Sequence, residues 1–168
     1  MDIKIKLYTS SLFEETAQMI TDLMNYHRKL TNARKEFWQT IDESKKTLEE
    51  WLDSGHIYHV FYNDSLAGFF YIRFGGQSAA WLEDLFIKEE FRSLGIGKEA
   101  FKLLDEMLTE RGTRAMFVNV IPRNIEAIRF YKECGFDHLN LIQLRKNYDE
   151  KLNKDENIDI LGFNFKKY

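Results

Sequence analysis

The stretch EEFRSLGIGKEAF, residues 89–101, decides the fold predicted for this chain. It places two glycines, Gly95 and Gly97, one residue apart between a charged loop and a run with helical periodicity. A glycine in the first turn of a helix costs about 1 kcal/mol relative to alanine, so a pair indicates a close approach to the backbone. Backbone N–H groups at a helix N-terminus, with the positive end of the helix dipole behind them, suit a phosphate. The sequence therefore predicts a phosphate-binding loop.

Three phosphate-binding patterns compete for these glycines. A P-loop requires a glycine and a Ser or Thr at the positions of Arg92 and Glu99, so it fails twice. Gly95, Gly97 and Ala100 satisfy the G-x-G-x-x-A pattern of dinucleotide-binding folds. That fold also requires a glycine at the strand end and an acid about 20 residues later, and neither is present. The remaining pattern is R-x-x-G-x-G, in which Arg92 adds a charged clamp.

Hydrophobic periodicity and helix caps predict the other elements. Before the loop we expect a strand at residues 3–7, a helix that starts at a Ser11–Glu14 capping box, a helix that Asp42 caps and Gly55 ends, and an antiparallel meander of strands at 57–62, 66–74 and 79–87. After it we expect a helix from Ile96 to Gly112, a strand at 115–121 parallel to the one before the loop, a helix capped by Asn124, and strands at 136–145 and 158–165. The predicted fold class is α/β, with a mixed, mostly antiparallel sheet of about seven strands flanked by about four helices.

Length and composition limit the function classes. A chain of 168 residues with 44% hydrophobic residues can fill one core, so we expect a single domain, 1–168. The net charge of -3 arises from well-mixed charges, which favours neither a nucleic-acid partner nor a membrane surface. The start MDIKIKLYT has no apolar signal core, and the longest apolar run, Leu66–Ile72, is far shorter than the roughly 20 residues of a membrane helix. We therefore expect a cytoplasmic protein.

The loop and the later stretch NIEAIRFYKECGF, residues 124–136, together resemble the GNAT superfamily of N-acetyltransferases. The order of elements matches that superfamily over nearly the whole chain. The resemblance implies acetyl-CoA as donor, with its pantetheine arm lying like an added strand between the splayed strands before and after the loop. It implies contacts of Leu85, Phe86 and Ile87 with the pantetheine, of Arg92, Ser93, Leu94, Gly95, Ile96, Gly97 and Lys98 with the pyrophosphate, and of Asn124 with the cofactor as well. Dimers are common in the family, so a homodimer is open to this chain.

A narrower resemblance concerns the acceptor. WLEDLFIKEEFRSLGIG, residues 81–97, is similar to the diamine (spermidine/spermine) acetyltransferase branch. In that branch the glutamate matching Glu83 engages the amine, and the tyrosine matching Tyr131 is the proton donor. The residues before Asn124 read IPR, without an acid for a polycation, and the region Met24–Trp38 is basic and aromatic. A polyamine, an aminoglycoside, another small amine and a peptide N-terminus therefore stay open as acceptors.

The chemistry of acetyl transfer assigns roles to these residues. A free amine must attack, and its ordinary pKa is about 10, so a base is required, for which Glu83 and Asp84 are the candidates. Neighbours in a strand point to opposite faces, so only one of them faces the acetyl group unless a bulge intervenes, and the family position favours Glu83. A strand amide at Leu85 or Phe86 would stabilise the oxyanion. The resemblance makes Tyr131 the donor to the leaving thiolate.

Each candidate also has a structural interpretation. Glu83 can face solvent in mid-strand, and Tyr131 shares a helical stripe with apolar residues, which is typical of a packed core tyrosine. The rival function is a non-catalytic module that binds or senses acyl-CoA. The presence of both Glu83 and Tyr131 argues against it. His56 and His59 lie three apart in a strand, hence on opposite faces, with no cysteine or third histidine beside them. We therefore predict no metal.

Overall fold

The computed structural model describes residues 2–168, and Met1, where the predicted domain begins, lies outside the described residues. The described residues contain four α-helices and seven strands, in the numbers that the sequence predicts. The helices are α1 (Phe13–Leu30), α2 (Ile41–Ser54), α3 (Ile96–Glu110) and α4 (Ile125–Glu133). The strands are β1 (Ile3–Leu7), β2 (His56–Tyr62), β3 (Ser65–Gly75), β4 (Ala79–Ile87), β5 (Ala115–Val118), β6 (Asn157–Ile160) and β7 (Phe163–Lys166). The chain forms two compact units, one ending at Asn119 and one comprising Val120–Tyr168, and a single domain stays a prediction.

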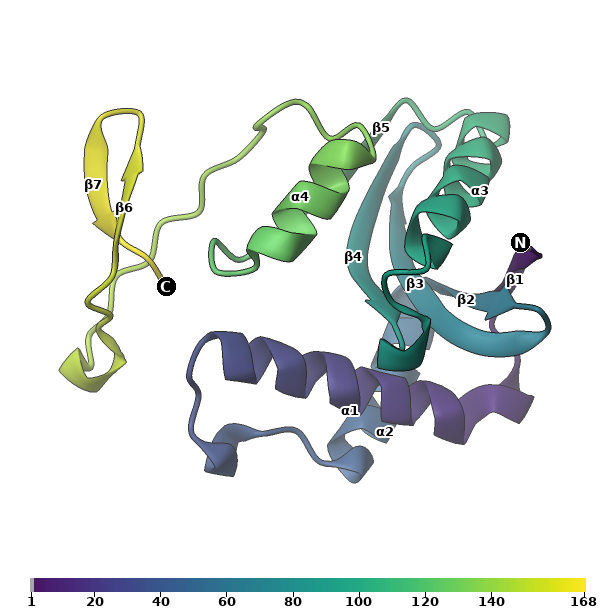
Figure 1. The fold of residues 1–168 in the computed structure, drawn as a ribbon, viewed down its shortest axis with the longest axis horizontal. Helices are drawn as coiled ribbons and strands as arrows, with labels where there is room; N and C mark the ends of the chain where they lie inside the picture. Colours follow the sequence, from purple (N-terminus) through teal and green to yellow (C-terminus); the bar gives the residue numbers. More distant parts are fainter. Residues whose placement is uncertain (1) are drawn as a thin grey trace. The chain divides into compact units, whose positions relative to one another are not determined.

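The first unit is built around one five-stranded sheet with the order β1-β2-β3-β4-β5 (Figure 1). The first four strands pair antiparallel with their neighbours, which confirms the predicted meander. β5 pairs parallel to β4, and α3 is the crossover between them, as expected for a strand, helix and strand unit. The chain therefore passes from β4 through the glycine loop directly into α3.

Helices cover both faces of this sheet (Figure 1). On one face, buried side chains of α1 and α2, among them Ile20, pack on β3 and β4. Trp51 of α2 stacks on Tyr71 of β3 with ring centres 4.4 Å apart. On the other face, Phe101 of α3 meets Phe70 of β3 edge to face, with ring centres 6.1 Å apart. Successive residues of β3 thus enter different layers of the core, as the pleat of a strand requires.

A buried histidine links β2 to α1. His59 is 1% exposed, and its Nε2 lies 2.8 Å from the Thr16 hydroxyl. That hydroxyl donates to the Leu12 carbonyl over 2.6 Å, so it accepts from a protonated Nε2. Burial lowers the pKa of His59 to about 4. His59 is therefore a neutral core residue at physiological pH.

The start of α1 differs from the prediction. A 3-10 turn, Ser10–Leu12, precedes the helix, which begins at Phe13. The Ser11 side chain caps no helical amide, and its hydroxyl lies 3.0 Å from that of Thr9. The predicted Ser11–Glu14 capping box is therefore wrong, because the preceding 3-10 turn moves the helix start beyond Ser11.

The start of α2 differs in the same way. Thr40, not Asp42, is the N-cap. The Thr40 hydroxyl accepts from the amide of Glu43, and the Glu43 carboxylate accepts from the amide of Thr40. This reciprocal box pairs two amides of the helix end, whereas a single cap at Asp42 would pair one.

The second unit contains α4 and a two-stranded sheet. Asn124 caps α4 as predicted, because its Oδ1 accepts from the amide of Ala127 over 3.1 Å. The stretch 136–145 forms no strand, although its apolar residues alternate, because no strand pairs with it among the described residues. The predicted strand at 158–165 is instead the antiparallel hairpin of β6 and β7, which turns at Leu161 and Gly162 with φ of 57° and 81°.

Candidate active site

A β-bulge in β4 brings two acidic residues to one face of the sheet. Tyr71 pairs with Asp84, but the next residue of β3 pairs with Leu82, so Glu83 is an extra residue in β4. Asp84 therefore lies on the face of Tyr71, which α1 and α2 cover. The Glu83 carboxylate reaches Arg73, two positions from Tyr71 and on the same face of β3. A regular strand would place only one of the two acids on this face. Because of the bulge, both lie on it.

The two acids differ in their electrostatic surroundings. Arg73 donates from Nε to Glu83 Oε1 over 2.6 Å, and the Glu83 side chain is 24% exposed. Burial first, and then the neighbouring charge of Glu83, raise the pKa of Asp84 to about 7. Asp84 can therefore take up and release a proton near neutral pH, as a general base must.

The parallel pairing between β4 and β5 stops half-way along β4. Ala79–Leu82 pair with Ala115–Val118, and β5 ends there rather than at Ile121 as predicted. In the part of the chain that the structure describes, no strand pairs with Glu83–Ile87 on the β5 side. This open edge lies where the resemblance implies that the pantetheine arm adds like a strand.

The ladder with β3 fixes which amides point to the open edge. The amide of Lys88 donates to the carbonyl of Ala67 over 2.8 Å. Amide directions alternate along an antiparallel strand, so the amide of Phe86 points toward β3, while those of Leu85 and Ile87 point away from it. Of the two predicted oxyanion donors, Leu85 is therefore the one whose amide faces the open edge.

Arg92 binds the last residue of β4. Its Nε donates to the carbonyl of Ile87 over 2.8 Å. The guanidinium carbon lies 5.4 Å from the ring centre of Phe86 and 5.8 Å from that of Tyr26, within the range of cation–π attraction. These contacts place Arg92 beside the open edge, and its contact with a pyrophosphate stays a prediction.

The predicted phosphate loop, Ser93–Lys98, runs into the first turn of α3. Gly95 is the N-cap with a φ of 78°, and Ser93 has a φ of 60°. A Cβ on Gly95 would meet no atom within 4 Å, so the backbone conformation requires glycine there, not close packing. The first amides of α3 have no acceptor within the helix and are directed out of its end, which suits an anion. Binding of a pyrophosphate by Ser93–Lys98 stays a prediction.

Two predicted site residues belong to the second unit. The Asn124 side chain is occupied as the cap of α4 and is 9% exposed. The Tyr131 ring packs edge to face against Phe130 and Phe136, with ring centres 5.5 Å away in both cases. Tyr131 thus packs against aromatic rings, as expected for a packed core tyrosine. Its role as proton donor, and a contact of Asn124 with the cofactor, stay predictions.

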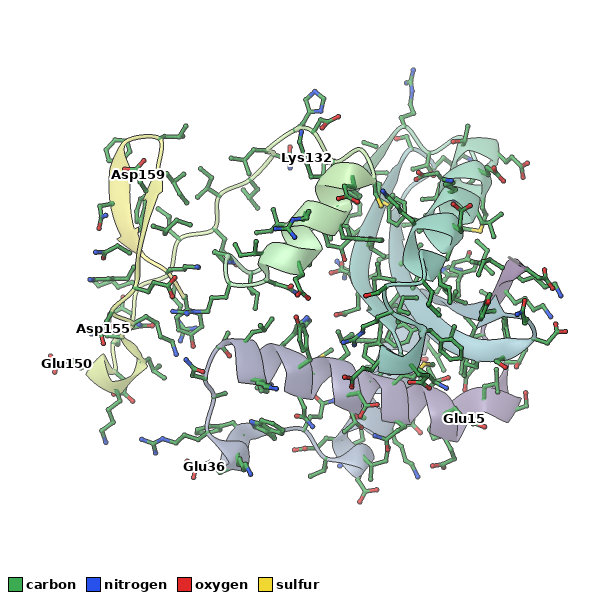
Figure 2. All side chains as sticks on the ribbon, viewed as in Figure 1. Glu15, Glu36, Lys132, Glu150, Asp155 and Asp159 are labelled. Atoms are coloured by element: carbon green, nitrogen blue, oxygen red, sulfur yellow. The ribbon has the colours of Figure 1, made fainter. Side chains whose placement is uncertain are left out.

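A groove of about 680 Å³ runs along α1 on the same side of the sheet as the acid pair. One wall is a polar stripe of α1 that includes Glu15 (Figure 2), and the other is the segment that follows β4. The groove reaches Phe86, two residues after Asp84 on the same face of β4. The acids that line it are Glu15, Asp22, Glu89 and Glu90, and the cations are Lys29, Lys88 and Arg92. Charges of both signs suit a polar ligand that carries hydrogen-bonding groups.

Arg73 is a residue of this site that the sequence analysis did not identify. A signal existed, because the regular hairpin around the turn that joins β3 to β4 pairs Arg73 with Trp81. Glu83 is then the next residue of β4 on the face of Arg73, within reach of a long side chain. Opposite charges in this diagonal position predict an ion pair.

The sequence of the chain matches the model of the "Acetyltransferase (GNAT) family" over residues 20–136. The chain belongs to the GNAT acetyltransferase family. Its members are N-acetyltransferases that use acetyl-CoA, which confirms the predicted enzyme class. The match spans the acid pair, the open edge, the glycine loop and α4.

Individual GNAT proteins resemble the chain in sequence or in fold. The spermine/spermidine N(1)-acetyltransferase of Bacillus subtilis is 30% identical over 107 residues, which cover 57% of this chain and 70% of that protein. A GNAT acetyltransferase from Elizabethkingia anophelis, solved with acetyl-CoA bound, has a TM-score of 0.62 at 18% identity and covers 96% of this chain and 91% of its own. The aminoglycoside N-acetyltransferase AAC(6')-Iy, solved with CoA, has a TM-score of 0.65 at 16% identity and covers 88% and 96%. The two structures show that the GNAT fold is shared.

Residues 2–168 offer no group of three or more His, Cys, Asp or Glu side chains that could hold a metal ion. His56 and His59 are three residues apart in β2, so they lie on opposite faces of the sheet. Of the two, only His59 is buried. Over the same residues no helix is both long enough and apolar enough to cross a bilayer.

Proposed function

We propose that this GNAT enzyme transfers the acetyl group of acetyl-CoA to a primary amine of a small molecule. The observation that carries the proposal is the acid pair Glu83 and Asp84 on one face of β4, at the start of the open edge of the same strand. A free strand edge suits the amides and carbonyls of a pantetheine arm. A carboxylate beside it suits an amine that must lose a proton before it attacks.

The transfer requires a base, an oxyanion donor and a proton donor. An ammonium group with an ordinary pKa of about 10 gives a proton to the acid pair, and its nitrogen then attacks the thioester carbonyl carbon. The resulting oxyanion accepts a hydrogen bond from the amide of Leu85. The C–S bond breaks, Tyr131 gives its proton to the leaving thiolate, and the second proton that the nitrogen loses goes to water, from which Tyr131 is reprotonated. Glu83 is the base that the family resemblance favours.

The donor is held, in this proposal, by main-chain groups more than by side chains. Leu85, Phe86 and Ile87 line the pantetheine arm, and the amides of Ser93–Lys98 receive the pyrophosphate at the start of α3. Arg92 adds a positive charge and Asn124 a contact from α4. The relatives solved with acetyl-CoA and with CoA support this choice of donor.

The acceptor enters along the groove beside α1 in this proposal. A polyamine is the first candidate, because the Bacillus subtilis relative is a spermine/spermidine acetyltransferase and four carboxylates line the groove. An aminoglycoside is the second, in view of the similarity in fold to AAC(6')-Iy. Release of free CoA thiol, measured over polyamines, aminoglycosides, amino acids and peptides, tests the proposal. One strong acceptor would name the substrate, whereas no release with any of them would favour a module that only binds acyl-CoA.

Acetyl-CoA should raise the melting temperature of the protein. At a concentration about 100-fold above Kd, mass action adds about 2.7 kcal/mol to the free energy of unfolding. NAD and ATP at the same concentration should add much less, because neither presents a pantetheine arm to β4. Thermal unfolding with each ligand measures the difference. Equal stabilisation by NAD would contradict the assignment of the donor.

Gly97→Val should remove most of this stabilisation, because the new side chain would stand where the phosphates approach the first turn of α3. Gly76→Val, in the turn between β3 and β4, is the matched control, since it puts a valine in place of a glycine away from the loop. The control should keep the shift that acetyl-CoA causes. A folded Gly97→Val protein that responds like the control would mean that the loop is structural only.

Tyr131→Phe should lower turnover by about 10- to 1000-fold and leave the melting temperature and acetyl-CoA affinity nearly unchanged. The substitution keeps the ring contacts with Phe130 and Phe136 and deletes only the hydroxyl. The loss is partial, because a thiolate whose conjugate thiol has a pKa of about 8.5 can depart unprotonated. Tyr148→Phe, at an exposed position of the same unit, is the control. Full activity of a stable Tyr131→Phe enzyme would leave Tyr131 with a packing role alone.

A further inference from the structure

The acid pair is part of a three-residue arrangement that includes an arginine from the neighbouring strand. Arg73 donates its Nε hydrogen to Glu83 over 2.6 Å, and its own side chain is 50% exposed. Glu83 is the extra residue of the bulge, so no residue of β3 pairs with it and its side chain is free to follow the arginine. The arrangement gives Glu83 a fixed partner and leaves Asp84 as the more enclosed carboxyl group.

A carboxylate in an ion pair is a poor proton acceptor, because protonation would cost it the charge-assisted hydrogen bond. Glu83 is the carboxylate in such a pair, because its Oε1 accepts a hydrogen bond from Arg73 Nε over 2.6 Å. Asp84 is in the reverse position, because burial and the adjacent Glu83 charge both favour its protonated form. The neighbours thus differ in their surroundings, since Glu83 has an ion-pair partner and Asp84 is the more enclosed group, although their side chains have the same chemistry.

Two titratable side chains of β3 lie on the same face of the sheet as Asp84. These are Arg73 and Tyr71, whose hydroxyl lies 2.8 Å from that of Ser54 on α2. Besides burial, the charge of Glu83 is what raises the pKa of Asp84, and Arg73 is the ion-pair partner of that charge.

We propose that Asp84 is the catalytic base and that Arg73 is a positioning residue, which holds Glu83 as a permanent anion beside it. The inference rests on the proposed function. The ammonium group of the acceptor gives one proton to a carboxylate oxygen of Asp84, which later releases it to water, and the free amine then attacks the acetyl carbon. Glu83 keeps its charge throughout, strengthens Asp84 as a base and attracts the ammonium group. Arg73 prevents Glu83 from taking the proton itself.

Profiles of turnover against pH test this assignment, with the best acceptor of the panel. Asp84→Asn should lose about 100- to 1000-fold in kcat. Glu83→Gln should lose less than about tenfold near neutral pH, and its acid limb should move to lower pH, because a negative charge next to Asp84 is gone. Arg73→Gln should move the acid limb up by about one pH unit, because a positive charge is gone. Arg73→Lys, which keeps the charge, should move it less.

The control is Lys4→Gln, which breaks an exposed ion pair of β1 with Asp2 and Asp64 and should change neither kcat nor the limb. A loss of more than about 100-fold in Glu83→Gln, with Asp84→Asn nearly unaffected, would return the role of base to Glu83 and overturn the proposal. An acid limb that stays in place in Arg73→Gln would overturn the positioning role.

A second measurement does not depend on turnover, so it separates this inference from the proposed function. Carbon-13 NMR of the carboxyl groups in the unliganded protein should find Asp84 titrating near neutral pH. The midpoint should fall in Glu83→Gln and rise in Arg73→Gln. An Asp84 midpoint that is the same in both variants would overturn the proposal even in an active enzyme. Absence of CoA release from the wild type, with these shifts present, would instead overturn the proposed function.

Discussion

Asp84→Asn is expected to make the free energy of unfolding rise by about 3 kcal/mol between pH 4 and pH 6.5, a range in which the wild type stays nearly level. The wild-type carboxyl group has a pKa of about 7 in the folded protein and about 3.8 when unfolded. Between these values the unfolded chain is ionised at Asp84 and the folded protein is not, so stability falls as pH rises. Asparagine removes this loss.

His59 has the opposite effect in the same range. Its pKa is about 4 in the folded protein and about 6.5 when unfolded, so its contribution to stability is complete above pH 6.5 and is lost as pH falls toward 4. A shift of this size corresponds to about 3 kcal/mol. In the wild type the losses and gains at Asp84 and His59 therefore nearly cancel.

Urea unfolding at half-unit steps of pH measures these slopes. His59→Gln serves as the reciprocal variant, because its free energy of unfolding should fall as pH rises from 4 to 6.5, while that of Asp84→Asn should rise. Only the slopes are compared, since each substitution also changes the absolute stability. If the free energies of unfolding of wild type and Asp84→Asn change in parallel with pH, Asp84 is ionised in the folded protein at pH 5. That result would contradict its role as the catalytic base.

Gly68→Ala is expected to lower the free energy of unfolding by about 3 kcal/mol, the upper part of the range for overpacking. Gly68 lies on β3 opposite Ile87, and an added Cβ would stand 2.1 Å from the carbonyl oxygen of Phe86. The obstacle is backbone, so β4 must move away from β3. That movement displaces the open edge, and the stabilisation that acetyl-CoA provides should shrink as well.

Gly76→Ala is the matched control for this substitution. Gly76 has a φ of 65°, but a Cβ there would meet no atom within 4 Å. Its cost is that of a left-handed backbone conformation for alanine, about 1 kcal/mol. Urea unfolding of the two variants, with and without acetyl-CoA, separates a steric conflict from a conformational one. Equal losses would mean that β3 and β4 have room between them.

The order of elements could be predicted because each boundary has a local cause. A period-two pattern marks β1, runs of aromatic and β-branched residues between turn residues mark β2 to β4, Asn124 caps α4, and Gly95 adopts the left-handed conformation that starts α3. The parallel pairing of β5 followed from the handedness rule for a strand, helix and strand unit. The two wrong caps show the limit of such signals, since Ser11 and Asp42 lie within three residues of the true helix starts.

The features that could not be predicted depend on which strands pair with each other and in which register. The stretch 136–145 alternates as a strand should, but a strand exists only where a partner supplies its hydrogen bonds, and no local pattern reports the partner. The bulge at Glu83 is a property of the register between β3 and β4, so the shared face of the two acids could not be predicted from β4 alone. Arg73, by contrast, could have been predicted, because the register next to the turn places its opposite charge diagonally across from Glu83.

Because of the bulge, the facing of the other residues of β4 does not depend on the presence of Glu83. Deleting one residue from a regular strand reverses the facing of every side chain beyond it. Deleting Glu83 would not, because Leu82 already pairs with Ile72 and Asp84 with Tyr71, and the two halves of β4 would join as a regular ladder. The residue that bears the first carboxylate is thus an insertion that the sheet can lose. A chain that lacks Glu83 would therefore keep the same side chains of β4 directed at the core.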